Sequence, residues 1–133
     1  MRDIGKYHDL GPIFCCLNES FFAGAVDAQI RWGRRITRRR KWFRRSVNMT
    51  LGSYCRRRKL ITIHPNLDRP LVPRYFVEAI IFHEMCHQIT GGEVVNGRRR
   101  LHTRQFKEQE IRYPEFEKAR IWAKKNLRYL LQN

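Results

Sequence analysis

The chain is 133 residues long and strongly basic, with 28 lysines and arginines against 12 aspartates and glutamates and a formal charge of +16. This length suits one domain, and we expect residues 1–133 to form it, with a core at about 14–127. No stretch approaches the roughly 18 apolar residues of a membrane span, and the first residues carry no apolar leader. Without C-x-x-C pairs or a regular cysteine framework, the sequence favours a cytoplasmic protein with reduced, mostly buried thiols.

The amino-terminal half of the sequence predicts one helix and three strands. Apolar residues recur at helical spacing from residue 14, which predicts a helix that ends near residue 28. Residues 30–32 are typical of a short strand. Apolar and polar residues alternate over 47–51, which indicates a second strand, and 60–64 indicates a third. A charged turn at 53–59 would join the last two strands as an antiparallel hairpin.

The carboxy-terminal half predicts three helices. The longest begins at Pro73, is apolar nearly all round, and ends at Gly91. A glycine- and arginine-rich connection (91–101) separates it from a short helix at about 103–112. Pro114 opens a final helix whose apolar stripe consists of Phe116, Ala119, Ala123, Leu127 and Leu130. These elements predict an α+β fold, in which a small antiparallel sheet packs on the long helix with further helices on its flanks.

The long helix carries an H-E-x-x-H motif, formed by His83, Glu84 and His87. Residues four apart share a helix face, so the two imidazoles can bind one zinc ion. Glu84 lies about 100° round the helix from His83, where its carboxylate can act as the base for an attacking water. Two histidines and a glutamate on a buried helix would be costly without partners or a metal. The motif therefore predicts a zinc metallopeptidase centre on a minimal zincin-like fold, with Glu84 as the catalytic residue.

A catalytic zinc ion needs a third protein ligand and an open position for water. His102 follows a connection long enough to turn the chain back, and Thr103 can cap a helix that begins there. His102 would then face the motif and complete the site with its two histidines. Glu108 and Glu110, on the same short helix, are alternatives, because glutamate serves as the third ligand in many zinc peptidases.

The positive charge is concentrated in three runs, at 31–45, 56–59 and 98–100. Such runs favour a polyanion as partner, through phosphate contacts and counterion release. Aromatic residues between the arginines of the first run favour single-stranded or junction-like DNA, because bases stack on aromatic rings and on guanidinium planes. The candidate nucleic-acid-binding residues are Arg38, Arg39, Arg40, Lys41, Trp42, Arg44 and Arg45.

Five segments together form a recognisable pattern: 17–24 (LNESFFAG), 30–33 (IRWG), 61–65 (ITIHP), 83–87 (HEMCH) and 102–106 (HTRQF). In this pattern the chain resembles the SprT-like zinc metallopeptidases, whose animal relatives of the Spartan type cleave proteins crosslinked to DNA. The resemblance covers roughly residues 14–127. It implies His83, His87 and His102 as zinc ligands, Glu84 as catalytic base, and a protein or peptide substrate that is associated with DNA.

Two features depart from the family pattern. Thr103 stands where the family usually has glycine after the third histidine, and the C-terminal zinc ribbon of many members has no counterpart in these 133 residues. We therefore expect a bare catalytic domain that acts as a monomer, away from membranes, and that is associated with the nucleoid if its source is a bacterium.

Two other interpretations use the same residues. Peptide deformylases also have an H-E-x-x-H motif with an upstream cysteine ligand, a role that Cys55 could take, although the interval is short and the other motifs of that family are missing. A nucleic-acid-binding module with a purely structural zinc would need a fourth protein ligand, such as Glu110. If the chain is a peptidase, the substrate would lie extended beside an edge strand. Candidates to stabilise the transition state are Tyr54, Tyr75 and Tyr113.

Overall fold

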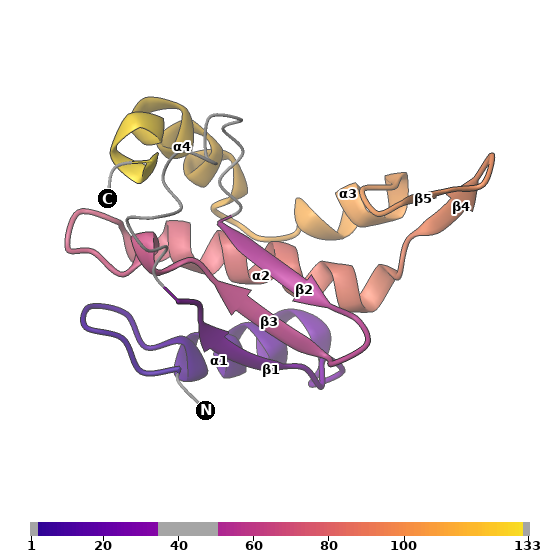
Figure 1. Ribbon diagram of the computed structural model, residues 1–133, viewed down its shortest axis with the longest axis horizontal. Helices are drawn as coiled ribbons and strands as arrows, with labels where there is room; N and C mark the ends of the chain where they lie inside the picture. The colour runs from indigo at the N-terminus through magenta and orange to yellow at the C-terminus, as the bar shows by residue number, and fades with distance from the viewer. Residues whose placement is uncertain (1–2, 35–50, 132–133) are drawn as a thin grey trace.

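The structure, a computed structural model, describes residues 3–34 and 51–131 and has the predicted α+β fold (Figure 1). In chain order its elements are α1 (Leu10–Phe22), β1 (Gln29–Trp32), β2 (Gly52–Cys55), β3 (Leu60–Ile63), the 3-10 turn η2 (Pro65–Leu67), α2 (Arg74–Thr90), β4 (Glu93–Val95), β5 (Arg98–Arg100), α3 (Arg104–Glu110) and α4 (Phe116–Leu131). None of the helices in the described residues is long and apolar enough to cross a membrane.

The central sheet has the strand order β1-β3-β2. β2 pairs antiparallel with β3 across the predicted hairpin, whereas β1 pairs with β3 in parallel. The prediction of an antiparallel sheet is therefore wrong for β1, and the sheet is mixed. The connection between β1 and β2 is long enough for β2 to lie on the opposite side of β3 from β1. Because β2 and β3 are antiparallel and β1 runs opposite to β2, β1 and β3 run in the same direction. Among the described strands, β2 keeps one free edge.

Helix α2 lies at the centre of the molecule. It packs against β2 and β3 of the sheet and against α1, α3 and α4, and Figure 1 places α1 and α2 together behind the sheet. Ile61 and Ile63 of β3 and Ile81 and Met85 of α2 are completely buried between these layers. Burial of such a side chain is worth about 1.5–3 kcal/mol, so the helix that carries the H-E-x-x-H motif is held by the main core.

Two predicted boundaries differ from the structure. The first helix ends at Phe22, because Ala23 takes a left-handed conformation with φ 50°, and a turn at residues 23–24 follows before β1. The second strand begins at Gly52, where the sequence predicted its end. Residues 47–50 of the predicted strand lie outside the described residues.

The connection at 91–101, which was expected to turn the chain back, contains an ordered hairpin. β4 and β5 pair antiparallel, and in Figure 1 they project beyond the carboxy-terminal end of α2. Asn96 and Gly97 form the turn with φ angles of 52° and 75°. Asn-Gly between two short runs is a strong hairpin signal, which the interpretation of the sequence overlooked.

Two expectations about burial are also wrong. The predicted stripe on the last helix holds for Ala119 and Leu130, which are buried, but Leu127 is 56% exposed. Asn126 has non-helical angles (φ −119°, ψ 18°), and this break turns the last part of α4 relative to the first. All four cysteines are free as predicted, but only Cys86 is buried. The exposed ones are Cys15, Cys16 and Cys55.

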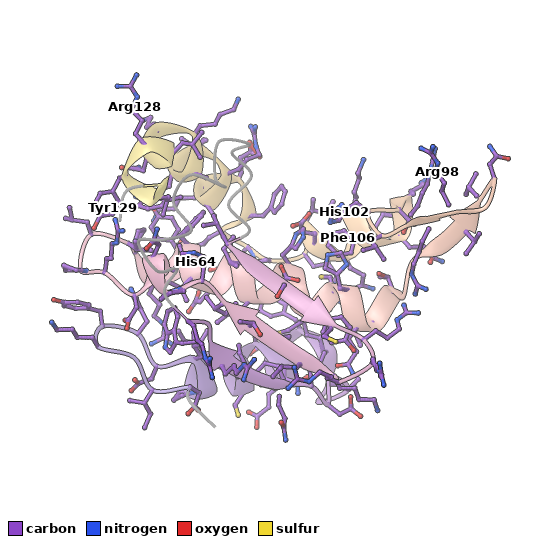
Figure 2. All side chains as sticks on the ribbon, in the orientation of Figure 1. His64, Arg98, His102, Phe106, Arg128 and Tyr129 are labelled. Atoms are coloured by element: carbon purple, nitrogen blue, oxygen red, sulfur yellow. The ribbon has the colours of Figure 1, made fainter. Side chains whose placement is uncertain are left out.

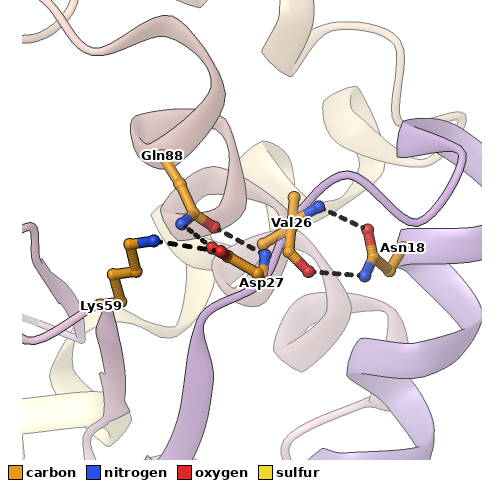
Figure 3. Close-up of polar contacts among 5 residues, drawn as sticks. All are labelled: Asn18, Val26, Asp27, Lys59 and Gln88. Carbon is orange, nitrogen blue, oxygen red and sulfur yellow. Dashed lines mark hydrogen bonds and ion pairs between the residues drawn. The ribbon is translucent and has the colours of Figure 1, made fainter.

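A polar network ties the connection between α1 and β1 to the last turns of α2 (Figure 3). The Asn18 side chain donates to the carbonyl of Val26 at 2.8 Å and accepts from its N–H at 3.1 Å. Asp27 donates its backbone N–H to Gln88 Oε1 at 3.1 Å, and its carboxylate accepts from Gln88 and from Lys59. Hydrogen bonds from Lys59 and Gln88 hold the pKa of Asp27 below its usual range. Because Gln88 follows the second motif histidine, the network helps to place the turn that carries it.

Candidate metal centre

Three histidines converge on one point above α2. His83 and His87 come from α2, and His102 follows β5 immediately before α3. One ring nitrogen of each lies within 4.8 Å of the other two. The ring centroids are 4.9 to 5.1 Å apart. Within residues 3–34 and 51–131 this is the one group of histidine, cysteine and acidic side chains that could hold a metal ion.

The start of α3 places His102 over the helix. Thr103 caps α3, as predicted, by accepting a hydrogen bond from the N–H of Phe106 at 3.2 Å. The buried Phe106 ring then lies 4.8, 4.5 and 5.0 Å from the rings of His83, His87 and His102. Figure 2 shows His102 and Phe106 side by side at this junction. Phe106 is therefore the apolar support of all three imidazoles, a role that the sequence alone did not assign.

Glu84 is buried under strand β2, with only 5% of its surface exposed. A Cβ atom at Gly52 would lie 3.1 Å from Glu84 Oε2 and 2.8 Å from Ile80 Cγ2, so the strand can approach the carboxylate only because residue 52 is glycine. Burial raises the pKa of Glu84 to about 7, against the opposing effect of the nearby His83. A carboxylate with this pKa can both accept and return a proton near neutral pH.

Glu110 takes a supporting position behind His83. Its Oε2 forms a short contact with Nδ1 of His83, which leaves Nε2 of that ring for a metal. Burial would lower the pKa of His83, but the hydrogen bond to Glu110 and the charge of Glu84 outweigh it and raise the pKa. A carboxylate on the far nitrogen of a metal-binding histidine fixes the orientation of its ring. Glu108, the other alternative ligand, is exposed and lies 3.6 Å from Arg104.

The other two histidines are kept in the neutral form that binds metals. Burial and the charges of His83 and His102 lower the pKa of His87 to about 4. Burial, followed by the charge of His83, also lowers the pKa of His102. Two neutral imidazoles and a third whose Nε2 is left open by the contact with Glu110, with a space on the other side, suit a divalent metal such as zinc.

A cavity of about 500 Å³ opens over the three histidines. Residues 52–54 of β2 form one side of it, and Arg99 and Leu101 of the hairpin segment form the other. Tyr54 is the one of the three candidate tyrosines that lines this space. The hydroxyl of Tyr113 instead donates to Glu78 Oε1 at 2.6 Å and lies 3.1 Å from the carbonyl of Tyr75, which is a structural arrangement.

The two other interpretations receive no support from this geometry. Cys55 is exposed and does not belong to the histidine group, as the deformylase arrangement would require. No fourth side chain of the described residues joins the group, which a closed structural zinc site would need. The candidate nucleic-acid-binding residues, Arg38, Arg39, Arg40, Lys41, Trp42, Arg44 and Arg45, lie outside the described residues.

The fold and the site together define a minimal zincin-like domain with a candidate metal site on its central helix. Comparison with known protein families matches residues 11–113, and the chain belongs to the SprT-like family. The match runs from α1 through Tyr113 and includes the three histidines, Glu84 and Glu110. No curated protein and no solved structure matches the chain.

Proposed function

We propose that this protein is a zinc-dependent endopeptidase that acts on proteins associated with DNA or crosslinked to it. The observation that carries the proposal is the buried Glu84 beside three convergent histidines, in a cavity lined by β2, an outer strand among those that the structure describes. Membership of the SprT-like family supports a metallopeptidase-like domain.

The residues around the cavity suggest how a peptide bond would be cut. A zinc ion held by His83, His87 and His102 would activate water and polarise the scissile carbonyl. Glu84 accepts a proton from the attacking water and passes it to the leaving amine, which its pKa of about 7 permits. Burial raises the pKa of Tyr54, so its hydroxyl stays protonated and can donate to the oxygen that becomes negative.

Strand β2 is the candidate docking edge for the substrate. It is an outer strand of the sheet, and its residues 52–54 line the cavity directly above Glu84. An extended peptide can add to such an edge through backbone hydrogen bonds, which require no particular side chains. This mode suits an endopeptidase that accepts unfolded segments of many proteins.

The involvement of DNA rests on the charge of the chain. A formal charge of +16, with a long basic run at 31–45, favours contact with phosphates. Exchanging Arg38, Arg39 and Arg40 for glutamine should weaken binding of a single-stranded oligonucleotide and reduce the slope of its salt dependence. If neither changes, this run does not bind DNA.

The test of the function is proteolysis of a basic DNA-binding protein by the zinc-loaded protein, with and without single-stranded DNA. Glu84→Gln should retain zinc and lose activity by about 10²–10⁴-fold, the usual contribution of a general base. Cleavage that requires Glu84 but not DNA would support the peptidase and remove its link to DNA. If nothing is cut while zinc and DNA both bind, a nucleic-acid-binding module with a structural metal becomes the better description.

A further inference from the structure

Two arginines meet at the edge of the cavity, on the same carbonyl oxygen. Arg56 from the turn after β2 and Arg99 from β5 both donate through Nη2 to the carbonyl of Gly91, the residue that ends α2. The bond from Arg99 measures 2.9 Å. Both side chains also line the cavity over the histidines. Segments far apart in the sequence thus bring two guanidinium groups together beside the candidate metal centre.

The charges of this arginine pair are not neutralised by any acidic side chain that the structure describes. Neither residue forms an ion pair with one of them. Among the described side chains, the one acidic residue that lines the cavity is Glu84, which lies buried below β2. Each guanidinium has five N–H donors, and the bond to Gly91 uses one nitrogen of each. The carbonyl therefore orients the pair and leaves donors free toward the cavity.

We propose that Arg56 and Arg99 form a carboxylate-binding subsite, which selects peptides that carry a carboxylate near the scissile bond. The inference rests on the proposed peptidase function and adds a substrate preference to it. Guanidinium groups bind carboxylates through paired, charge-assisted hydrogen bonds, and a pre-oriented pair loses little entropy in doing so. The carboxylate can belong to an aspartate or glutamate side chain, or to the carboxy terminus of the substrate.

The direction of β2 separates these two sources. Arg56 follows the carboxy-terminal end of β2, whereas Gly52 begins the strand. A peptide that pairs antiparallel with β2 has its amino-terminal part beside Arg56, so the subsite would receive an acidic side chain on the amino-terminal side of the cut. A peptide that pairs parallel brings its carboxy-terminal part there, where a chain end could bind.

The experiment uses short fluorogenic peptides that are identical except for Glu, Gln or Lys at one position, scanned across the cleavage site. Each is made with a free and with an amidated carboxy terminus. For the zinc-loaded parent protein we expect kcat/KM about tenfold higher with Glu than with Gln at the preferred position, as charge-assisted hydrogen bonds allow. A preference that follows the free terminus instead would assign the subsite to the chain end.

Variants of the pair test the assignment to these two residues. Arg56→Gln and Arg99→Gln should each remove most of the preference for Glu, and Arg99→Glu should reverse it in favour of Lys. Arg98→Gln is the matched control, because Arg98 is exposed on the same strand and does not line the cavity. It should keep the preference of the parent protein. Thermal unfolding of each variant checks that the fold is retained.

The outcomes separate this inference from the proposed function. Equal rates on the Glu, Gln and Lys peptides would overturn the subsite while leaving the peptidase intact. If no peptide is cut, binding of the same peptides to the zinc-loaded Glu84→Gln variant is measured instead. Tighter binding of the Glu peptide that is lost when Arg99→Gln is added supports the subsite. Equal binding of the Glu, Gln and Lys peptides overturns it. Loss of affinity for a single-stranded oligonucleotide on Arg99→Gln, without any preference for Glu, would assign the pair to phosphates and also overturn it.

Discussion

The candidate metal site joins two parts of the chain that are held in different ways. His83 and His87 belong to the central helix, which packs against the sheet and three other helices. His102 is exposed and lies between a projecting hairpin and the short helix α3. The first part is positioned by packing on the sheet, α1 and α4, whereas the second is held on α2 through α3. Its contacts include the cap formed by Thr103, the buried ring of Phe106 and the contact of Glu110 with His83.

This difference indicates what a metal ion would add. The helix part exists without the ion, because its geometry follows from core packing. The His102 part gains a strong additional bond to the helix when metal binds, so binding should stabilise residues 91–113 more than the rest of the domain. Three predictions test this contrast.

The largest effects are expected from the two phenylalanines that support the two parts, Phe82 and Phe106, both of which are buried. Phe82→Ala should lower the free energy of unfolding of the whole domain by about 3–5 kcal/mol, because it opens a cavity in the core. Phe106→Ala should instead weaken zinc binding most, while backbone amides of the central sheet keep their protection from hydrogen exchange. Urea unfolding, zinc titration and hydrogen exchange measure these effects. The same profile for both variants would contradict the division into two parts.

Glu110→Gln should weaken zinc binding by about 10–100-fold, the usual effect of losing a carboxylate that orients a metal-binding histidine. Glu108→Gln is the matched control, since Glu108 lies on the same helix but is exposed and paired with Arg104. It should leave zinc affinity unchanged. Competition of each variant with a zinc-binding dye measures the difference. Equal affinities for the two variants would mean that the contact between Glu110 and His83 does not support the site.

The same contrast explains how much of the site could be predicted from sequence. The spacing of His83 and His87 and the apolar surroundings of their helix are local features, so the helix and its motif could be recognised directly. The packing of Phe106 under the three rings and the contact of Glu110 with His83 depend on how α3 folds back, which no local pattern specifies. Gly52 illustrates the same point: it appeared to weaken a strand, yet its missing side chain is what lets β2 lie against Glu84.

The smallest effect concerns the cost of burying Glu84 in the helix part of the site. Its pKa is about 7 in the folded protein against an ordinary value of 4.5, so the folded state binds its proton more tightly than the unfolded state. The contribution of this bound proton to the free energy of unfolding is fully present below pH 4.5 and is lost as the pH rises through about 7. Metal-free Glu84→Gln should therefore be more stable than the metal-free parent at pH 8, by on the order of 1–2 kcal/mol, and should lose this advantage near pH 4.5.

Urea unfolding of both metal-free proteins at the two pH values measures this difference. His87 titrates in both, with a pKa lowered to about 4, so its opposite dependence on pH largely cancels in the comparison. If Glu84→Gln is more stable than the parent by the same amount at both pH values, the added stability comes from packing or hydrogen bonding of the glutamine. The ionised, buried carboxylate would then not lower the stability of the parent. An advantage confined to high pH would mean that the helix part of the site holds its base at the expense of stability, which the core contacts of α2 offset.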